Sequence, residues 1–147
     1  MRTMSAETVR DAMVPEPTTL TADASAQEAG GCFADTGEVR AIFVTADDGR
    51  LLGVVTRKTL VREVVAAGLD PGAVTLREIA EPPNFTLDAG LELDGAFRFL
   101  EEHDLERVPV VEADGRLVGV LSRAVVRRRL AEDEPPEGEP DPGSLVL

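Results

Sequence analysis

Two junctions between an apolar run and a predicted helix hold the side chains best suited to bind an anion. Thr56 and Ser122 each stand at such a junction. A helix N-terminus presents free backbone N–H groups and the positive end of the helix dipole, which together favour a phosphate. The same hydroxyls are also ordinary helix caps, so the pattern indicates either a phosphate site or two capped helices. The basic residues near these junctions are Arg40, Arg57, Lys58, Arg107 and Arg123.

Catalytic chemistry has little support among the remaining residues. The one histidine, His103, lies near the end of a predicted helix, where the helix dipole stabilises an imidazolium. The one cysteine, Cys32, lies beside Phe33 on another predicted helix and has no adjacent base to activate it. Neither residue has a partner at metal-ligand spacing, and no phosphate-binding glycine loop occurs. We therefore expect no enzymatic activity, no catalytic residues and no metal site.

The two junctions belong to two copies of one strand pattern. Residues 40–56 and residues 107–122 each contain two runs of branched apolar residues joined by Asp-Gly. Glycine supplies the positive φ of a tight reversal, so each copy is predicted to be a β-hairpin. The apolar runs are continuous instead of alternating, which indicates sheets covered on both faces. Helices are expected on one face and a second sheet on the other.

The elements around each hairpin are repeated as well. Each repeat is predicted to run helix, strand, helix, strand, strand, helix. Ser25 and Glu28 form a capping box that opens the long helix of the first repeat. The second copy is one residue shorter, and we assign the gap to the turn, where Asp48 is taken to have no counterpart. The predicted helices are 8–13, 25–36 and 57–67 in the first repeat, and 76–80, 92–103 and 123–131 in the second.

A long period that occurs only twice indicates a duplicated half-domain and not a solenoid. In each repeat the first two strands are joined through a helix, which predicts a parallel pair, and the hairpin adds an antiparallel neighbour. The sequence therefore predicts an α/β (α+β) fold of two pseudo-twofold-related repeats whose small sheets pack together. The predicted boundaries are 1–68 for the first repeat, 69–75 for a linker, 76–131 for the second repeat and 132–147 for a tail.

Charge and composition restrict the partners. The formal net charge of −13 opposes binding to the nucleic-acid backbone, which depends on Lys and Arg. The tail is acidic and rich in proline, so it is expected to be disordered. No apolar run approaches the ~20 residues that span a bilayer, and no signal peptide is evident. With a single cysteine, these features predict a cytoplasmic protein that contacts neither nucleic acid nor membrane.

The doubled pattern resembles the CBS-domain family and looks like a tandem CBS pair, or Bateman module. The resemblance covers about residues 8 to 131. The resemblance rests on the order of the doubled motifs more than on any single motif. The motifs are Thr19-Leu20-Thr21-Ala22-Asp23-Ala24-Ser25 before a helix, Val108-Pro109-Val110-Val111, the Asp-Gly turn, and Gly119-Val120-Leu121-Ser122.

The resemblance implies a non-catalytic sensor. Similar CBS pairs bind adenosine-containing ligands, such as AMP, ADP, ATP or S-adenosylmethionine, in clefts between their halves, and often form dimers through their helices. They regulate the proteins to which they are fused. Here no other domain is evident, so the regulated partner is expected to be a separate polypeptide. The family pattern places the base against residues near the first and second strands, at positions held here by Thr18, Ile42, Phe85 and Pro109.

The sequence departs from the family pattern at the ribose. The family usually has an aspartate three residues after the Thr or Ser, where this chain has Thr59 and Val125. Threonine accepts one hydrogen bond and valine none, and an unpaired ribose hydroxyl costs roughly 1 to 3 kcal/mol. Two hypotheses follow. The protein, which the resemblance predicts to be a homodimer, is either a ligand sensor, with Thr56, Thr59, Ser122 and the nearby arginines at its site, or a ligand-free scaffold for dimerisation and protein interaction.

Overall fold

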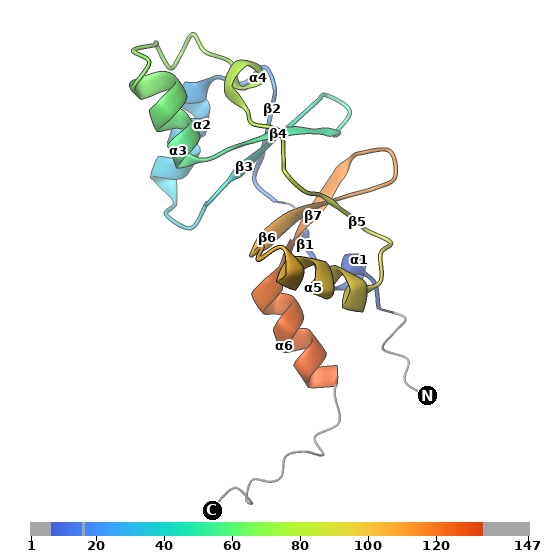
Figure 1. Ribbon diagram of the computed structural model, residues 1–147. Coiled ribbons are helices and arrows are strands. Elements are labelled where there is room, and N and C mark those ends of the chain that lie inside the picture. Colours follow the sequence, from blue (N-terminus) through green and yellow to red (C-terminus); the bar gives the residue numbers. More distant parts are fainter. Residues whose placement is uncertain (1–6, 16, 134–147) are drawn as a thin grey trace, which may run out of the picture.

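The computed structural model describes residues 7–15 and 17–133, which form two α/β halves (Figure 1). This architecture confirms the predicted fold class. The first half contains β2 (Thr19–Thr21), α2 (Ala26–Asp35), β3 (Ile42–Thr45), β4 (Leu51–Val55), α3 (Arg57–Leu60), the π-helix η2 (Val61–Val65) and α4 (Leu76–Ile79). The second half contains α1 (Val9–Ala12), β1 (Val14–Pro15), β5 (Leu87–Asp88), α5 (Leu93–Glu102), β6 (Arg107–Val111), β7 (Leu117–Ser122) and α6 (Arg123–Asp133).

Each half is built on a small mixed sheet. The first sheet has the order β2-β3-β4 and the second the order β1-β7-β6-β5. The pairs β2–β3 and β5–β6 are parallel, and the hairpins β3–β4 and β6–β7 are antiparallel, as the sequence predicted. Gly49 and Gly115 turn the two hairpins at φ values of +92° and +91°, a conformation that glycine adopts without a steric penalty.

The opening segment of each sequence repeat packs on the opposite half. Helix α1 places Val9 in the core of the second half, whereas α4 places Leu76 and Ile79 in the core of the first. Both Val9 and Leu76 are fully buried. Strand β1 then pairs with β7, and Glu81 forms the matching bridge to Val54. Each spatial half is therefore completed by a segment of the other sequence repeat.

One glycine in each hairpin allows a segment of the other repeat to approach closely. Strand β1 lies beside Gly119, and the segment that contains Glu81 lies beside Gly53. A Cβ on Gly119 would lie 2.8 Å from the carbonyl oxygen of Val14, and a Cβ on Gly53 would lie 3.0 Å from the carbonyl oxygen of Glu81. Real Cβ atoms essentially never lie closer than 3.0 Å to such atoms. The repeated Gly-Val dipeptides of the sequence thus mark the two points where a segment of the other repeat pairs closely with the second strand of a hairpin.

The halves have separate cores that meet through their hairpins. One core cluster belongs to each half and lies between its sheet and its helices. The hairpin ends are joined by two backbone hydrogen bonds of 3.0 Å, from Leu51 N to Gly115 O and from Leu117 N to Gly49 O. This contact relates the halves as the predicted pseudo-twofold arrangement requires.

The strand register corrects the alignment of the two repeats. Ile42 pairs with Val55 as Val108 pairs with Leu121, so Ile42 and Val108 are equivalent. Asp48 has a counterpart, because the backbone N–H of the residue two positions later bonds to its carboxylate in both turns. The prediction that the extra residue lies in the turn was wrong. It lies in the loop between α2 and β3.

Several helix ends differ from those predicted. The helix expected to continue to Ala67 is α-helical only to Leu60 and π-helical to Val65. Helix α6 continues to Asp133, two residues into the predicted tail. The rest of that tail lies outside the described residues. No helix in the described part of the chain is long and apolar enough to cross a membrane.

Candidate functional site

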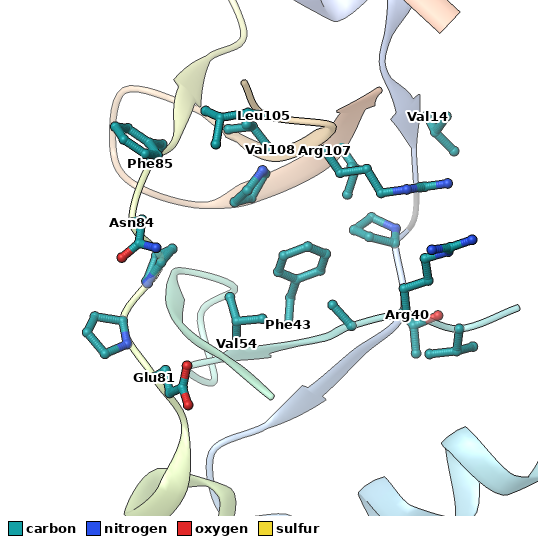
Figure 2. A pocket seen from close by; sticks show the side chains of 18 of the residues that line it. Val14, Arg40, Phe43, Val54, Glu81, Asn84, Phe85, Leu105, Arg107 and Val108 are labelled. Atoms are coloured by element: carbon teal, nitrogen blue, oxygen red, sulfur yellow. The ribbon is translucent and has the colours of Figure 1, made fainter. Parts of the chain in front are cut away.

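A cleft of about 560 Å³ lies between the two halves, and its wall contains residues of both. The segments before β2 and β3 form the wall that belongs to the first half, and the start of β6 forms the facing wall that belongs to the second half (Figure 2). The segment after α4 closes the cleft with Pro82 and Pro83, together with Asn84 and Phe85. The volume is within the range of small-molecule sites, roughly 300 to 1,000 Å³.

The two sides of the cleft differ in chemistry. Figure 2 shows Arg40 and Arg107 extending to the side on which Val14 lies, and Asn84 and Phe85 on the opposite side. Arg40 and Arg107 form no ion pair with any residue that the structure describes. The cleft therefore has a cationic side and an aromatic side.

Neither acidic group that the structure describes at the cleft forms an ion pair with these arginines. Glu81, on the aromatic side, is ion-paired with Arg62 of η2, and hydrogen bonds to Glu63 and then to Glu81 raise the pKa of Arg62. Glu38 also lines the cleft, and its side chain forms no ion pair within residues 7–15 and 17–133. Two cationic side chains are thus available to an anion that enters the cleft.

The structure brings five of the eleven predicted ligand residues to this cleft. They are Thr18, Arg40, Phe85, Arg107 and Pro109. The other six do not line it. They are Ile42, Thr56, Arg57, Thr59, Ser122 and Arg123.

Ile42 is replaced at the cleft by its neighbour Phe43. Ile42 is fully buried in the core of the first half, whereas Phe43 lines the cleft. The register makes Phe43 equivalent to Pro109, since each pairs with the cleft-lining valine of its hairpin partner, Val54 or Val120. A shift of one residue along a strand reverses the face to which a side chain points. Aligning Asp48-Gly49-Arg50 with Asp114-Gly115-Arg116 without a gap would have identified Phe43.

The predicted phosphate hydroxyls serve as helix caps. Thr56 Oγ1 accepts a hydrogen bond from Thr59 N at 3.2 Å, and Thr59 Oγ1 accepts one from Thr56 N at 3.1 Å. Ser122 Oγ lies 3.4 Å from Val125 N, which donates to it at the start of α6. Of the two interpretations left open by the sequence, helix capping accounts for the contacts observed.

A family comparison agrees with this architecture. The model of the CBS domain matches residues 9–66 and 76–132. The chain belongs to the CBS-domain family. The two matches correspond to the two sequence repeats, so the protein is a CBS pair.

Known relatives of this CBS pair include small proteins of similar length. Hypoxic response protein 1 of Mycobacterium tuberculosis is 36% identical over 95 residues, which cover 65% of this chain and 66% of that protein. The chain thus spans about two thirds of that relative's length. A crystal structure of Hypoxic Response Protein I with two coordinated zinc ions has a TM-score of 0.70 and 31% identity, and the match covers 84% of this chain and 98% of that one.

A third comparison concerns a ligand-bound structure. CBSX2 of Arabidopsis thaliana, in complex with AMP, has a TM-score of 0.67 and 25% identity to this CBS pair. The match covers 85% of this chain and 96% of that one. Zinc and AMP are properties of those relatives. Within the described residues of this CBS pair, no group of three or more His, Cys, Asp or Glu side chains could hold a metal ion.

Arg57 and Arg123 are structural residues of the CBS pair. The guanidinium of Arg57 donates to Val39 O at 2.8 Å and to Phe33 O at 3.2 Å, and lies 4.9 Å from the centre of the Phe33 ring. Arg123 is bonded in the equivalent way to Leu100 O. Its hydrogen bond to Glu106 raises its pKa, so it stays cationic. Both arginines join the start of the last helix to the end of the long helix.

Proposed function

We propose that this CBS pair is a non-enzymatic regulatory protein that binds an adenosine-containing ligand in the cleft and modulates a separate partner. The observation that carries this proposal is the pair of arginines, Arg40 and Arg107, which face one cleft without an ion-pair partner among the described residues. Both residues are exposed and so accessible to a ligand, and a guanidinium binds phosphate or carboxylate oxygens through charge-assisted, often bidentate hydrogen bonds.

The rest of the cleft suits the remainder of such a ligand. Phe43, Phe85 and Pro109 give it apolar walls against which a flat ring can pack. Asn84 adds an amide that both donates and accepts hydrogen bonds. The AMP complex of CBSX2, at 25% identity, supports a nucleotide of this class in a related fold.

Regulation would follow from the position of the cleft. The halves are connected by hydrogen bonds at their hairpin ends and have separate cores. A phosphate that contacts Arg40 of one half and Arg107 of the other would therefore restrain their relative orientation. A partner that recognises a surface made by both halves would respond to that restraint.

The alternative is a scaffold without a ligand, and two observations favour it. The position of the family's ribose aspartate is held by Thr59, whose side chain is occupied by helix capping and is only 1% exposed. Val61, Val65 and Leu69 are exposed by 56%, 70% and 49% on and after η2. Such an apolar surface suits association with a second copy or another protein.

Unfolding in the presence and absence of ligand separates the two functions, since only the sensor should be stabilised. Calorimetry is the method of choice, because the chain has no Trp or Tyr to report on folding. We would compare AMP, ADP, ATP and S-adenosylmethionine. A ligand at 100 times its dissociation constant stabilises the native state by about 2.7 kcal/mol, which raises the unfolding temperature by several degrees. The shift should disappear in a variant carrying Arg40→Ala and Arg107→Ala.

The matched control is Arg98→Ala, which removes an exposed arginine of α5 that does not line the cleft. This variant should keep the full shift. If none of the four compounds changes the unfolding temperature, the sensor function is wrong. Analytical ultracentrifugation of the wild type and of Val65→Glu would then test the scaffold function.

A further inference from the structure

The cleft is asymmetric in ways that the pseudo-twofold fold does not require. The register pairs Ile42 with Val55 and Val108 with Leu121, so the residue equivalent to Arg107 is Ala41. Arg40 lies in the loop that carries the extra residue of the first repeat. The two arginines are therefore not symmetry mates, and both extend to the same side of the cleft (Figure 2).

The opposite side of the cleft is built on three rings that contact one another. The Phe85 ring meets the Phe99 ring edge-on, with centroids 5.4 Å apart and an interplanar angle of 76°. The His103 ring lies 5.0 Å from Phe85 and 4.2 Å from Phe99. His103 Nδ1 is also 3.0 Å from Phe99 O, which fixes the imidazole at the end of α5. Of these three side chains, only Phe85 lines the cleft, and the other two support it from behind.

The first half cannot form such a ring cluster. Helices α2 and α5 occupy equivalent places, and the positions of Phe85, Phe99 and His103 correspond there to Thr18, Cys32 and Thr36. Thr18 and Thr36 both line the cleft, but neither offers an aromatic face. The cluster of three rings therefore exists on one side only, and the Phe43 ring lies between the two sides (Figure 2).

We propose that the cleft takes one ligand per chain in one orientation, with its flat ring against Phe85 and its anionic group at Arg40 and Arg107. Phe99 and His103 act as positioning residues that hold the Phe85 ring in place. This inference rests on the proposed function and deepens it. Two equivalent sites, one on each side of the cleft, would instead need an aromatic wall and a cationic group on both sides.

The experiment is titration calorimetry of the full chain with three probes: AMP, adenosine and ribose 5-phosphate. Wild-type protein should bind one AMP per chain. Arg40→Ala and Arg107→Ala should each weaken AMP and ribose 5-phosphate by about tenfold or more and leave adenosine nearly unchanged, since a charge-assisted hydrogen bond is lost.

The aromatic side should give the opposite pattern. Phe85→Ala should weaken AMP and adenosine by about fivefold to a hundredfold and leave ribose 5-phosphate unchanged. His103→Ala and Phe99→Leu should weaken the same two probes by a smaller factor. Phe97→Leu is the matched control, because Phe97 is another phenylalanine of α5 that does not line the cleft. It should leave all three affinities unchanged.

The outcomes separate this inference from the proposed function. Two AMP molecules per chain, or an equal loss of ribose 5-phosphate binding in Phe85→Ala, would overturn the single orientation while leaving nucleotide binding in place. Unchanged adenosine affinity in both Phe99→Leu and His103→Ala would overturn the positioning role. Absence of AMP binding to the wild type would overturn the proposed function and the inference together. Unchanged ribose 5-phosphate binding also shows that a variant is folded.

Discussion

The two halves agree wherever the backbone has a demanding path and differ where side chains face the cleft. Both turn at a glycine of positive φ, both pair a segment of the other repeat closely beside a glycine, and both join their last helix to their long helix through an arginine. On the cleft, however, Phe85 of the second half corresponds to Thr18 of the first. A symmetric fold thus encloses an asymmetric site.

This contrast shows which positions can change without disturbing the backbone of the duplicated fold. A turn glycine cannot be replaced without strain, and a glycine against which a neighbouring segment packs closely cannot accept a Cβ unless that segment shifts. A cleft-facing side chain has no such restriction, since its space is open on one side. Specificity can therefore arise by changing single residues in one half while the backbone of both halves stays the same.

The largest expected effect concerns the exchanged helices. Leu76→Ala should destabilise the protein by about 2–5 kcal/mol, because Leu76 is fully buried. Although Leu76 belongs to the second sequence repeat, it packs in the first core. Hydrogen exchange should therefore increase most in α2, β3 and β4. Val9→Ala should increase exchange in the second half instead.

The control for this pair is Leu69→Ala, at a side chain that is 49% exposed. It should change the free energy of unfolding little. If hydrogen exchange in Leu76→Ala increased only in α5, β6 and β7, the packing of α4 in the core of the first half would be contradicted.

A smaller loss of stability is expected where β1 and the Glu81 segment pack against glycines of the hairpins. Gly119→Ala should cost about 1–3 kcal/mol, because its Cβ would lie 2.8 Å from the Val14 carbonyl oxygen. Gly53→Ala should behave similarly, with a Cβ 2.8 Å from that of Ala80. Chemical denaturation would measure both. Gly31→Ala is the control in α2, where a Cβ meets nothing within 4 Å, and it should stabilise the protein by roughly 0.5–1 kcal/mol.

The long helices α2 and α5 are capped differently, so removing the side chain at the N-cap should lower the stability of the protein only for α2. Ser25 Oγ accepts a hydrogen bond from Glu28 N at 3.1 Å, whereas Glu92 at the start of α5 makes no such side-chain bond. Ser25→Ala should therefore cost about 1 kcal/mol, and Glu92→Ala should cost much less. Thermal unfolding of the two variants side by side tests the difference, and equal losses would contradict it.

The smallest effect concerns the hairpin turns, which should behave alike. A hydrogen bond from the backbone N–H of Arg50 lowers the pKa of Asp48 below 3.8, and Arg116 lowers that of Asp114 in the same way. The unfolded carboxylates thus bind protons at higher pH than the folded ones. Their stabilisation is present above 3.8 and is lost as the pH falls through the folded pKa values.

The measurement is the unfolding temperature as a function of pH for Asp48→Asn and Asp114→Asn. Each variant should be slightly less stable than the wild type at pH 7, and the difference should vanish in acid. Asp47→Asn, at a turn residue with no hydrogen bond to Arg50, is the control. A large effect in one turn and none in the other would show that the hairpins differ in more than their cleft-facing residues.

Local sequence signals predicted most of the elements. Asp-Gly between branched residues identified both hairpins, and Ser25 with Glu28 identified the start of α2. The repetition of these signals led to the CBS resemblance, which the family match confirmed. At the site, five predicted residues reached the cleft, and the ligand itself stays a prediction. The missed residue, Phe43, depended on the register of one strand.

The sequence by itself determined the hairpins, the main helices and the duplication, because each depends on residues close together in the chain. Only the tertiary structure decided which half α1 and α4 complete, since both halves offer similar apolar faces. It also decided that Arg40 and Arg107 lie on one side of the cleft and Phe85 on the other. Arg40 lies in the loop before β3 and Arg107 at the start of β6, so their common direction depends on how two segments far apart in the sequence pack against each other.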